Sequence, residues 1–148
     1  MPATEIPSKF WVRWLVAVIF GVMAFGLILV LAPSLTRQGF SLLVYSDAER
    51  IAAFGTEAVA YISLVHAVLG AVMFGWAVAL LLVVRGLFAQ GAFEGWQIVA
   101  VSVAAWFVPD TVFSLWSGFW QNALLNVVFI ILFALPLAAT YRTFHAQR

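Results

Sequence analysis

The sequence predicts an all-α fold: an integral membrane four-helix bundle with a short extracytoplasmic helix or loop between the first and second helices. Of its 148 residues, 66% are hydrophobic and 9% are charged, whereas soluble domains average about 45–50% and about 25%. Four apolar stretches account for this excess, and each is close to the roughly 20 residues that a helix needs to cross a bilayer. The composition excludes a soluble globular domain and a disordered chain, and indicates a single transmembrane domain over residues 1–148.

The apolar stretches predict helices over about residues 11–31, 58–84, 96–117 and 122–141. Pro33 follows the first helix, and Arg85 and Arg142 mark the expected ends of the second and fourth. Unbroken apolar runs favour helices, which satisfy their own backbone hydrogen bonds, over the alternating strands of a barrel. The first run exceeds the roughly 7–15 apolar residues of a signal peptide core, so we expect it to be retained as a membrane helix.

The basic residues at the helix ends predict the orientation in the membrane. Five of them flank the side that holds both termini, namely Lys9, Arg13, Arg85, Arg142 and Arg148. The opposite side has only Arg37 and Arg50. Because cytoplasmic flanks are rich in Lys and Arg, we expect both termini in the cytoplasm and a multi-pass protein of the inner (plasma) membrane of a bacterial cell.

The segment of residues 32–57 is the longest stretch outside the four helices. Ser46 and Glu49 have the spacing of a capping box, which predicts a short helix over residues 47–54 that ends at Gly55. Apolar residues in this segment indicate that it lies on the membrane surface or caps the bundle.

Small residues at four-residue spacing indicate a compact bundle, because they let backbones approach closely, either within the chain or against a partner. Such repeats occur in three of the helices: Ala17 and Gly21; Ala67, Ala71, Gly75 and Ala79; Ala100 and Ala104.

Polar residues within the apolar stretches are the candidate ligand-binding residues: Ser63, His66, Asp110, Ser114, Ser117, Asn122 and Asn126. Ionisable groups inside a membrane are costly and are often functional. The expected depths of His66 and Asp110 differ by only about 3 Å at the helical rise, which predicts that they face one another across the second and third helices. This polar layer is interpreted either as a structural hydrogen-bonded cluster, as a pocket for a small molecule or lipid headgroup, or as a proton-transfer site.

Several chemistries are excluded by the residues that the chain lacks. The absence of cysteine rules out disulfides, iron–sulfur ligation and cysteine-based zinc sites. His66 and His145 fall at opposite membrane sides, so one chain cannot ligate a haem through two histidines. We assign no catalytic residues, no metal site and no cofactor, and the lack of a basic block argues against nucleic acid as a partner.

Two segments carry a family resemblance: G-L-I-L-V-L-A-P over residues 26–33, and H-A-V-L-G-A-V-M-F-G-W over residues 66–76. With the outer loop between them, they resemble the DoxX-like group of small bacterial four-helix membrane proteins. Some members of that group are associated with quinone-linked sulfur oxidation, which the resemblance implies as one possible context. No site residue is transferred from the group.

Three functions follow as expectations. The first is a non-enzymatic accessory subunit or a binder of an apolar small molecule or lipid. The second is a quinone- or lipid-linked membrane enzyme or redox subunit that uses His66 and Asp110, and the third is a small oligomeric transporter. The expected partners are the lipid bilayer and either another membrane protein or a second copy of the chain.

Overall fold

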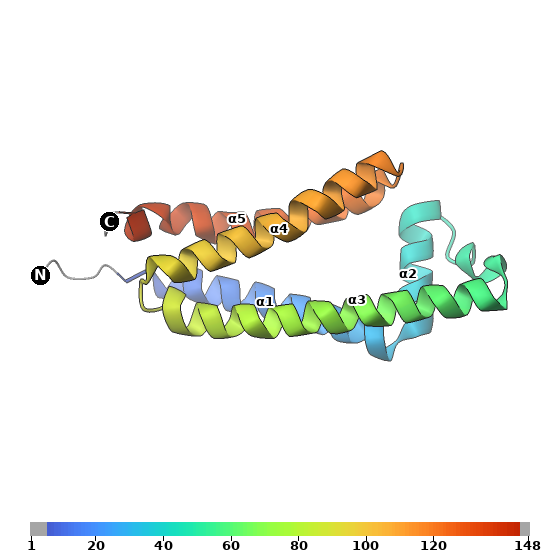
Figure 1. Cartoon of the computed structure of the whole chain (residues 1–148), viewed down its shortest axis with the longest axis horizontal. Helices are drawn as coiled ribbons and strands as arrows, with labels where there is room; N and C mark the ends of the chain where they lie inside the picture. The colour runs from blue at the N-terminus through green and yellow to red at the C-terminus, as the bar shows by residue number, and fades with distance from the viewer. Residues whose placement is uncertain (1–5, 146–148) are drawn as a thin grey trace, which may run out of the picture. The chain divides into compact units, whose positions relative to one another are not determined.

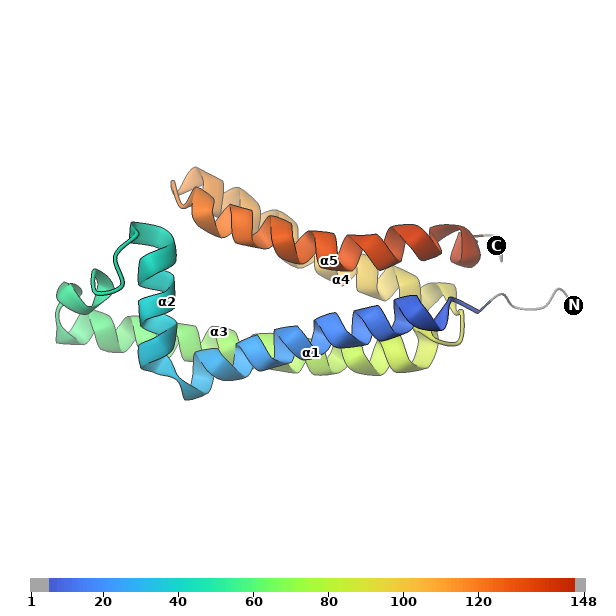
Figure 2. The same cartoon turned by 180° about the vertical axis from the view of Figure 1, so that it is seen from behind.

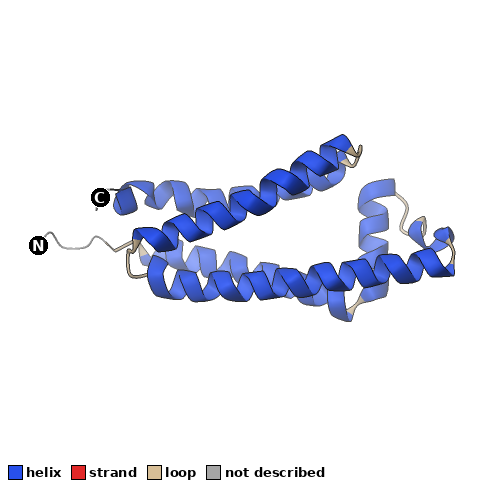
Figure 3. Cartoon of the chain, in the orientation of Figure 1, coloured by secondary structure: helices blue, strands red, loops and turns tan. Residues whose placement is uncertain are grey.

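The structure is a computed structural model that describes residues 6–145, and helices joined by short connections make up almost all of that range (Figure 3). The elements are α1 (Lys9–Leu31), α2 (Pro33–Tyr45), the 3-10 helix η1 (Ile51–Phe54), α3 (Thr56–Val83), the π-helix η2 (Val84–Phe88), α4 (Phe93–Trp116) and α5 (Trp120–His145) (Figure 1). The all-α fold class is confirmed.

Four helical stretches are long and apolar enough to cross a membrane: Lys9–Leu31, Thr56–Phe88, Phe93–Trp116 and Trp120–His145. The chain is therefore a small multi-pass integral membrane protein. It divides into two compact units. Among the described residues, the first unit comprises residues 6–20 and 78–145, and the second comprises residues 21–77.

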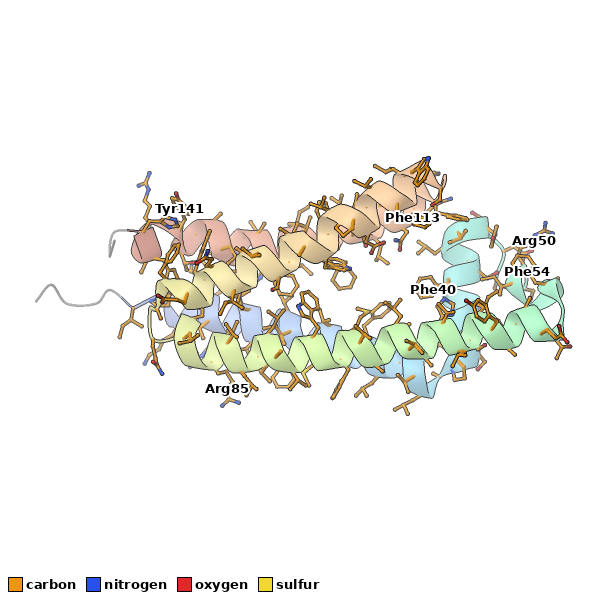
Figure 4. The ribbon with its side chains drawn as sticks, in the orientation of Figure 1. Phe40, Arg50, Phe54, Arg85, Phe113 and Tyr141 are labelled. Carbon is orange, nitrogen blue, oxygen red and sulfur yellow. The ribbon has the colours of Figure 1, made fainter. Side chains whose placement is uncertain are left out.

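The second membrane helix does not stop at Arg85 as expected. The backbone stays helical through this residue and continues as the π-helix to Phe88. The exposed Arg85 side chain extends away from the ribbon (Figure 4), so its charge does not have to end the helix. The start of α4 packs closely against the π-helix. A Cβ atom built on Gly95 would lie only 2.8 Å from the Cα atom of Phe88, so a larger residue at this position would collide with the backbone.

The connection between α1 and α3 contains a 13-residue helix, α2, that the sequence analysis did not predict. Pro33 stands at its first turn, a position where the missing N–H of proline has no cost. The predicted capping box is wrong: Ser46 has left-handed backbone angles and closes the C-terminus of α2 by donating its N–H to Leu42 O. The predicted helix over residues 47–54 is reduced to the short η1, which ends at Gly55.

In the first unit, two tryptophan side chains donate hydrogen bonds to backbone carbonyls of α5. The indole N–H of Trp14 donates to Leu132 O, and that of Trp96 donates to Leu137 O, both at 2.9 Å. Pro136 lies four residues after Leu132 and has no N–H to offer this carbonyl, so Trp14 supplies the hydrogen bond that the proline removes. At the end of α5, Phe144 is buried against Phe88 with ring centroids 4.8 Å apart.

In the second unit, α1 and α3 approach most closely at two glycines. A Cβ atom on Gly26 would lie 2.7 Å from Gly70 O and 3.1 Å from Phe74 N, so a larger residue cannot be placed there without moving a backbone. The buried side of α3 continues from Gly70 to Ala77, which is a seven-residue spacing.

Most of the predicted small residues do not lie on a buried face of the chain itself, and whether they contact a partner stays a prediction. Ala67 and Ala100 are half-buried, and the other six are exposed: Ala17, Gly21, Ala71, Gly75, Ala79 and Ala104. A strict four-residue repeat drifts around the helix, because four residues turn 400° rather than one full circle. A seven-residue repeat drifts much less, which explains why Gly70 and Ala77 share the buried face.

Candidate functional site

The candidate polar residues separate into two groups. Five of them belong to the first unit, namely Asp110, Ser114, Ser117, Asn122 and Asn126, and two belong to the second unit, namely Ser63 and His66. Because His66 and Asp110 lie in different units, their pairing stays a prediction.

The first group surrounds the carboxylate of Asp110, near the turn that joins α4 to α5. Asn122 donates from Nδ2 to Asp110 Oδ1 at 3.1 Å and to Ser114 Oγ at 2.8 Å. Ser114 Oγ donates to the backbone carbonyl of Asp110 at 2.7 Å and lies 3.4 Å from Oδ1, and the residue is 4% exposed. These three residues form a hydrogen-bonded triad that links the two helices, and we call it the Asp110 triad.

The remaining polar residues of this unit make simpler contacts. Asn126, which is buried, donates from Nδ2 to the hydroxyl of Thr111 at 3.3 Å, forming a second bond between α4 and α5. Ser117 donates to Phe113 O, a carbonyl of its own helix, at 2.7 Å. Hydrogen bonds between side chains of the first group thus join the neighbouring helices α4 and α5.

Sequence spacing explains this arrangement. Asp110 and Ser114 are four residues apart on α4, so they share one helix face. The turn at Gly118, which has a φ of 84°, reverses the chain, so that Asn122 at the start of α5 meets that face. The sequence analysis missed Thr111, although its place beside Asp110 was the available signal.

The second group centres on the ring of His66 in α3. This ring stacks on Phe40 of α2, with centroids 4.6 Å apart and planes inclined by 23°; Figure 4 labels Phe40 beside α3. The Nδ1 atom of His66 is buried and has no hydrogen-bond partner among residues 6–145. A buried polar atom without a partner costs about 1–3 kcal/mol, and Arg37 Nε in the same unit is a second such atom.

Ser63 does not supply the missing partner. It lies three residues before His66, and its hydroxyl donates to Val59 O at 2.8 Å within its own helix. Phe40 was missed by the sequence analysis as a site residue, because nothing in the sequence predicted that α2 is a helix that brings this ring to α3.

Among the residues that the structure describes, no three His, Asp or Glu side chains gather so that they could hold a metal ion. No family model, curated protein or solved structure matches the chain. The resemblance to DoxX-like proteins thus stays a prediction.

Proposed function

We propose that the protein is a non-enzymatic membrane protein that binds an apolar small molecule or lipid, whose polar group forms a hydrogen bond with His66. The observation that carries this proposal is the buried Nδ1 atom of His66, which lacks a partner within residues 6–145. Phe40 covers one face of the imidazole ring, so a ligand would meet the edge of the ring. A neutral imidazole can donate from one nitrogen and accept at the other, which suits a hydroxyl or carbonyl group.

The Asp110 triad is the weaker candidate for this role. Its carboxylate oxygen Oδ1 and the Ser114 hydroxyl already receive the amide of Asn122. Polar groups that satisfy one another across two helices fix the register of those helices. We therefore assign the Asp110 triad a structural role and place ligand binding at His66.

The test is native mass spectrometry of the purified protein, released from mild detergent. We expect the wild type to carry a small molecule and His66→Phe to lose it, because phenylalanine keeps the ring stack with Phe40 but has no nitrogen. His145→Phe is the matched control, since His145 also stacks on an aromatic ring, that of Tyr141, at 3.7 Å. Add-back of a phospholipid mixture and of a short-chain quinone in separate samples distinguishes the two ligand classes.

The proposal fails if the wild type neither retains nor takes up either class, or if His66→Phe binds as well as the wild type does. Unchanged thermal unfolding of ligand-free His66→Phe would show that loss of binding is not loss of folding.

We further propose that this protein lies in an inner (plasma) membrane with both termini in the cytoplasm. The distribution of Lys and Arg supports that orientation. The chain has no cysteine, so single cysteines introduced at the exposed Ser46 and Gln90 report each side. An impermeant thiol reagent should label Ser46→Cys in whole cells and spare Gln90→Cys. The reverse pattern would invert the topology.

A further inference from the structure

The start of α2 is fixed to the end of α1. Only Ala32 separates the two helices, and the hydroxyl of Thr36 donates to Ile28 O at 3.2 Å. Within the second unit, α2 runs across α3 instead of alongside it, as Figures 1 and 2 show from opposite sides. If α3 crosses the membrane, α2 lies along the plane of that membrane.

The contact between α1 and α3 shows at which level of α3 this happens. Gly26 meets Gly70, and the two helices run in opposite directions (Figure 2). Five residues further along α1, Leu31 is therefore level with Val65. The stacking of Phe40 on His66 agrees, because it joins α2 to α3 at that same level.

The lengths of the helices place the edge of the hydrocarbon here. The helical stretch Thr56–Phe88 has 33 residues, although a span needs about 20. The part from His66 to Phe88 is already roughly 34 Å long, as is α1 with its 23 residues, and the hydrocarbon core is about 30 Å thick. If Phe88 marks the opposite edge, the part of α3 before His66 projects beyond the hydrocarbon.

The sides of α2 differ in polarity in the direction that this placement requires. Ser41 Oγ donates to Asp47 O at 2.5 Å and accepts the N–H of Ile51 at 3.1 Å. Gln38, which lies about 60° from Ser41 and about 40° from Leu42 around the helix, donates to Glu49 at 3.4 Å. The polar side thus holds the segment that leads to the projecting start of α3.

Another side of α2 is apolar and open. Leu35 and Leu42 are seven residues apart, so they share a face, and they are 58% and 57% exposed. The exposed Gln38 lies at the border between this face and the side that carries Ser41. Successive residues of a helix are about 100° apart, which separates Leu42 from the side that carries Ser41. If α2 lies at the boundary between acyl chains and headgroups, these leucines contact lipid. If it lies outside the membrane, they are exposed to water.

We propose that α2 is an interfacial helix, which lies at the boundary between acyl chains and headgroups with Leu35 and Leu42 in contact with lipid. Helices with one apolar and one polar side bind in this manner. The occupant of the leucine face is the bilayer itself. The proposal does not depend on ligand binding by His66, so either can fail without the other.

The test is the depth of nitroxide labels on single cysteines in liposomes, measured from collision rates with oxygen and with a water-soluble nickel complex. Labels replace Leu35 and Leu42 in turn. Two exposed α3 positions serve as references: Tyr61, in the projecting part, and Val72, inside the proposed hydrocarbon span. We expect the ratio of oxygen to nickel collisions at both leucines to exceed the ratio at Tyr61 several-fold and to stay below that at Val72.

A ratio at both leucines equal to that at Tyr61 would place α2 in water, and a ratio equal to that at Val72 would place it within the hydrocarbon. Either result overturns the proposal. Two labelled positions are used so that a substitution that disturbs folding at one leaves the other to decide.

Discussion

In the first unit, side-chain hydrogen bonds join α5 to its neighbours, whereas in the second unit α1 and α3 meet through glycine backbones. The Asp110 triad and two tryptophans supply the bonds to α5. At the crossing of α1 and α3, Gly26 and Gly70 leave no room for a side chain.

The comparison shows two ways to hold helices together in lipid, where the hydrophobic effect contributes little. Hydrogen bonds between helices pair polar groups for which the bilayer core offers no partner. Close packing gives van der Waals contact between helix backbones that lipid chains cannot provide. The first unit satisfies its candidate polar residues internally. The second leaves His66 Nδ1 without a protein partner among residues 6–145, and this difference is the basis on which we propose that a ligand binds at His66.

The largest expected effect is on close packing in the second unit. Gly70→Val should lower the free energy of unfolding by about 1–3 kcal/mol or more, because its Cβ would meet the backbone of α1 and the Leu29 side chain at 2.6 Å. Unfolding by SDS in mixed micelles measures the loss. Gly75→Val is the control, since nothing lies within 4 Å of a Cβ there, and it should change stability by less than about 0.5 kcal/mol. Equal losses would refute the role of the glycine contact.

The second effect concerns the carbonyl of Leu132 in the first unit. Trp14→Phe should cost about 1–3 kcal/mol, because it leaves this carbonyl without a donor. Pro136→Ala restores an N–H four residues after Leu132. In the Pro136→Ala background, Trp14→Phe should therefore cost clearly less in the same unfolding measurement. An identical cost in both backgrounds would show that the indole does not replace the bond that the proline removes.

The smallest effect is expected in the Asp110 triad. Asn122→Leu removes both amide bonds to Asp110 and Ser114, and side-chain bonds between membrane helices average about 0.6 kcal/mol, with a maximum near 1.7 kcal/mol. We expect a loss within this range. Ser102→Ala provides the comparison, because this hydroxyl bonds only to Val99 O of its own helix and should matter less. If Asn122→Leu were neutral, the Asp110 triad would not hold α4 and α5 together.

Part of the polar site was accessible to sequence reasoning. Asp110, Ser114 and Asn122 were all among the polar residues singled out in the apolar stretches. The four-residue spacing of Asp110 and Ser114 places them on one helix face, and the reversal of the chain before Asn122 brings its amide within reach. Phe40 was not accessible, because its role depends on α2. A 13-residue segment that contains Pro33 and Gly39 has a weak helical signal, and isolated helices of this length are marginal in water. Contacts such as that between Phe40 and His66 hold it in place.

The sequence by itself determined the membrane class and the four membrane-length helices, because long apolar runs have only one economical backbone arrangement in lipid. Helix ends were less certain, as the passage of the helix through Arg85 shows. Only the tertiary structure decided that Gly26 meets Gly70, that Trp14 completes the bonding of Leu132, and that His66 stacks on Phe40. The physical reason is that these pairs are distant in the chain and depend on how helices turn toward each other. Helices that are apolar on all sides do not specify this rotation by their own sequence.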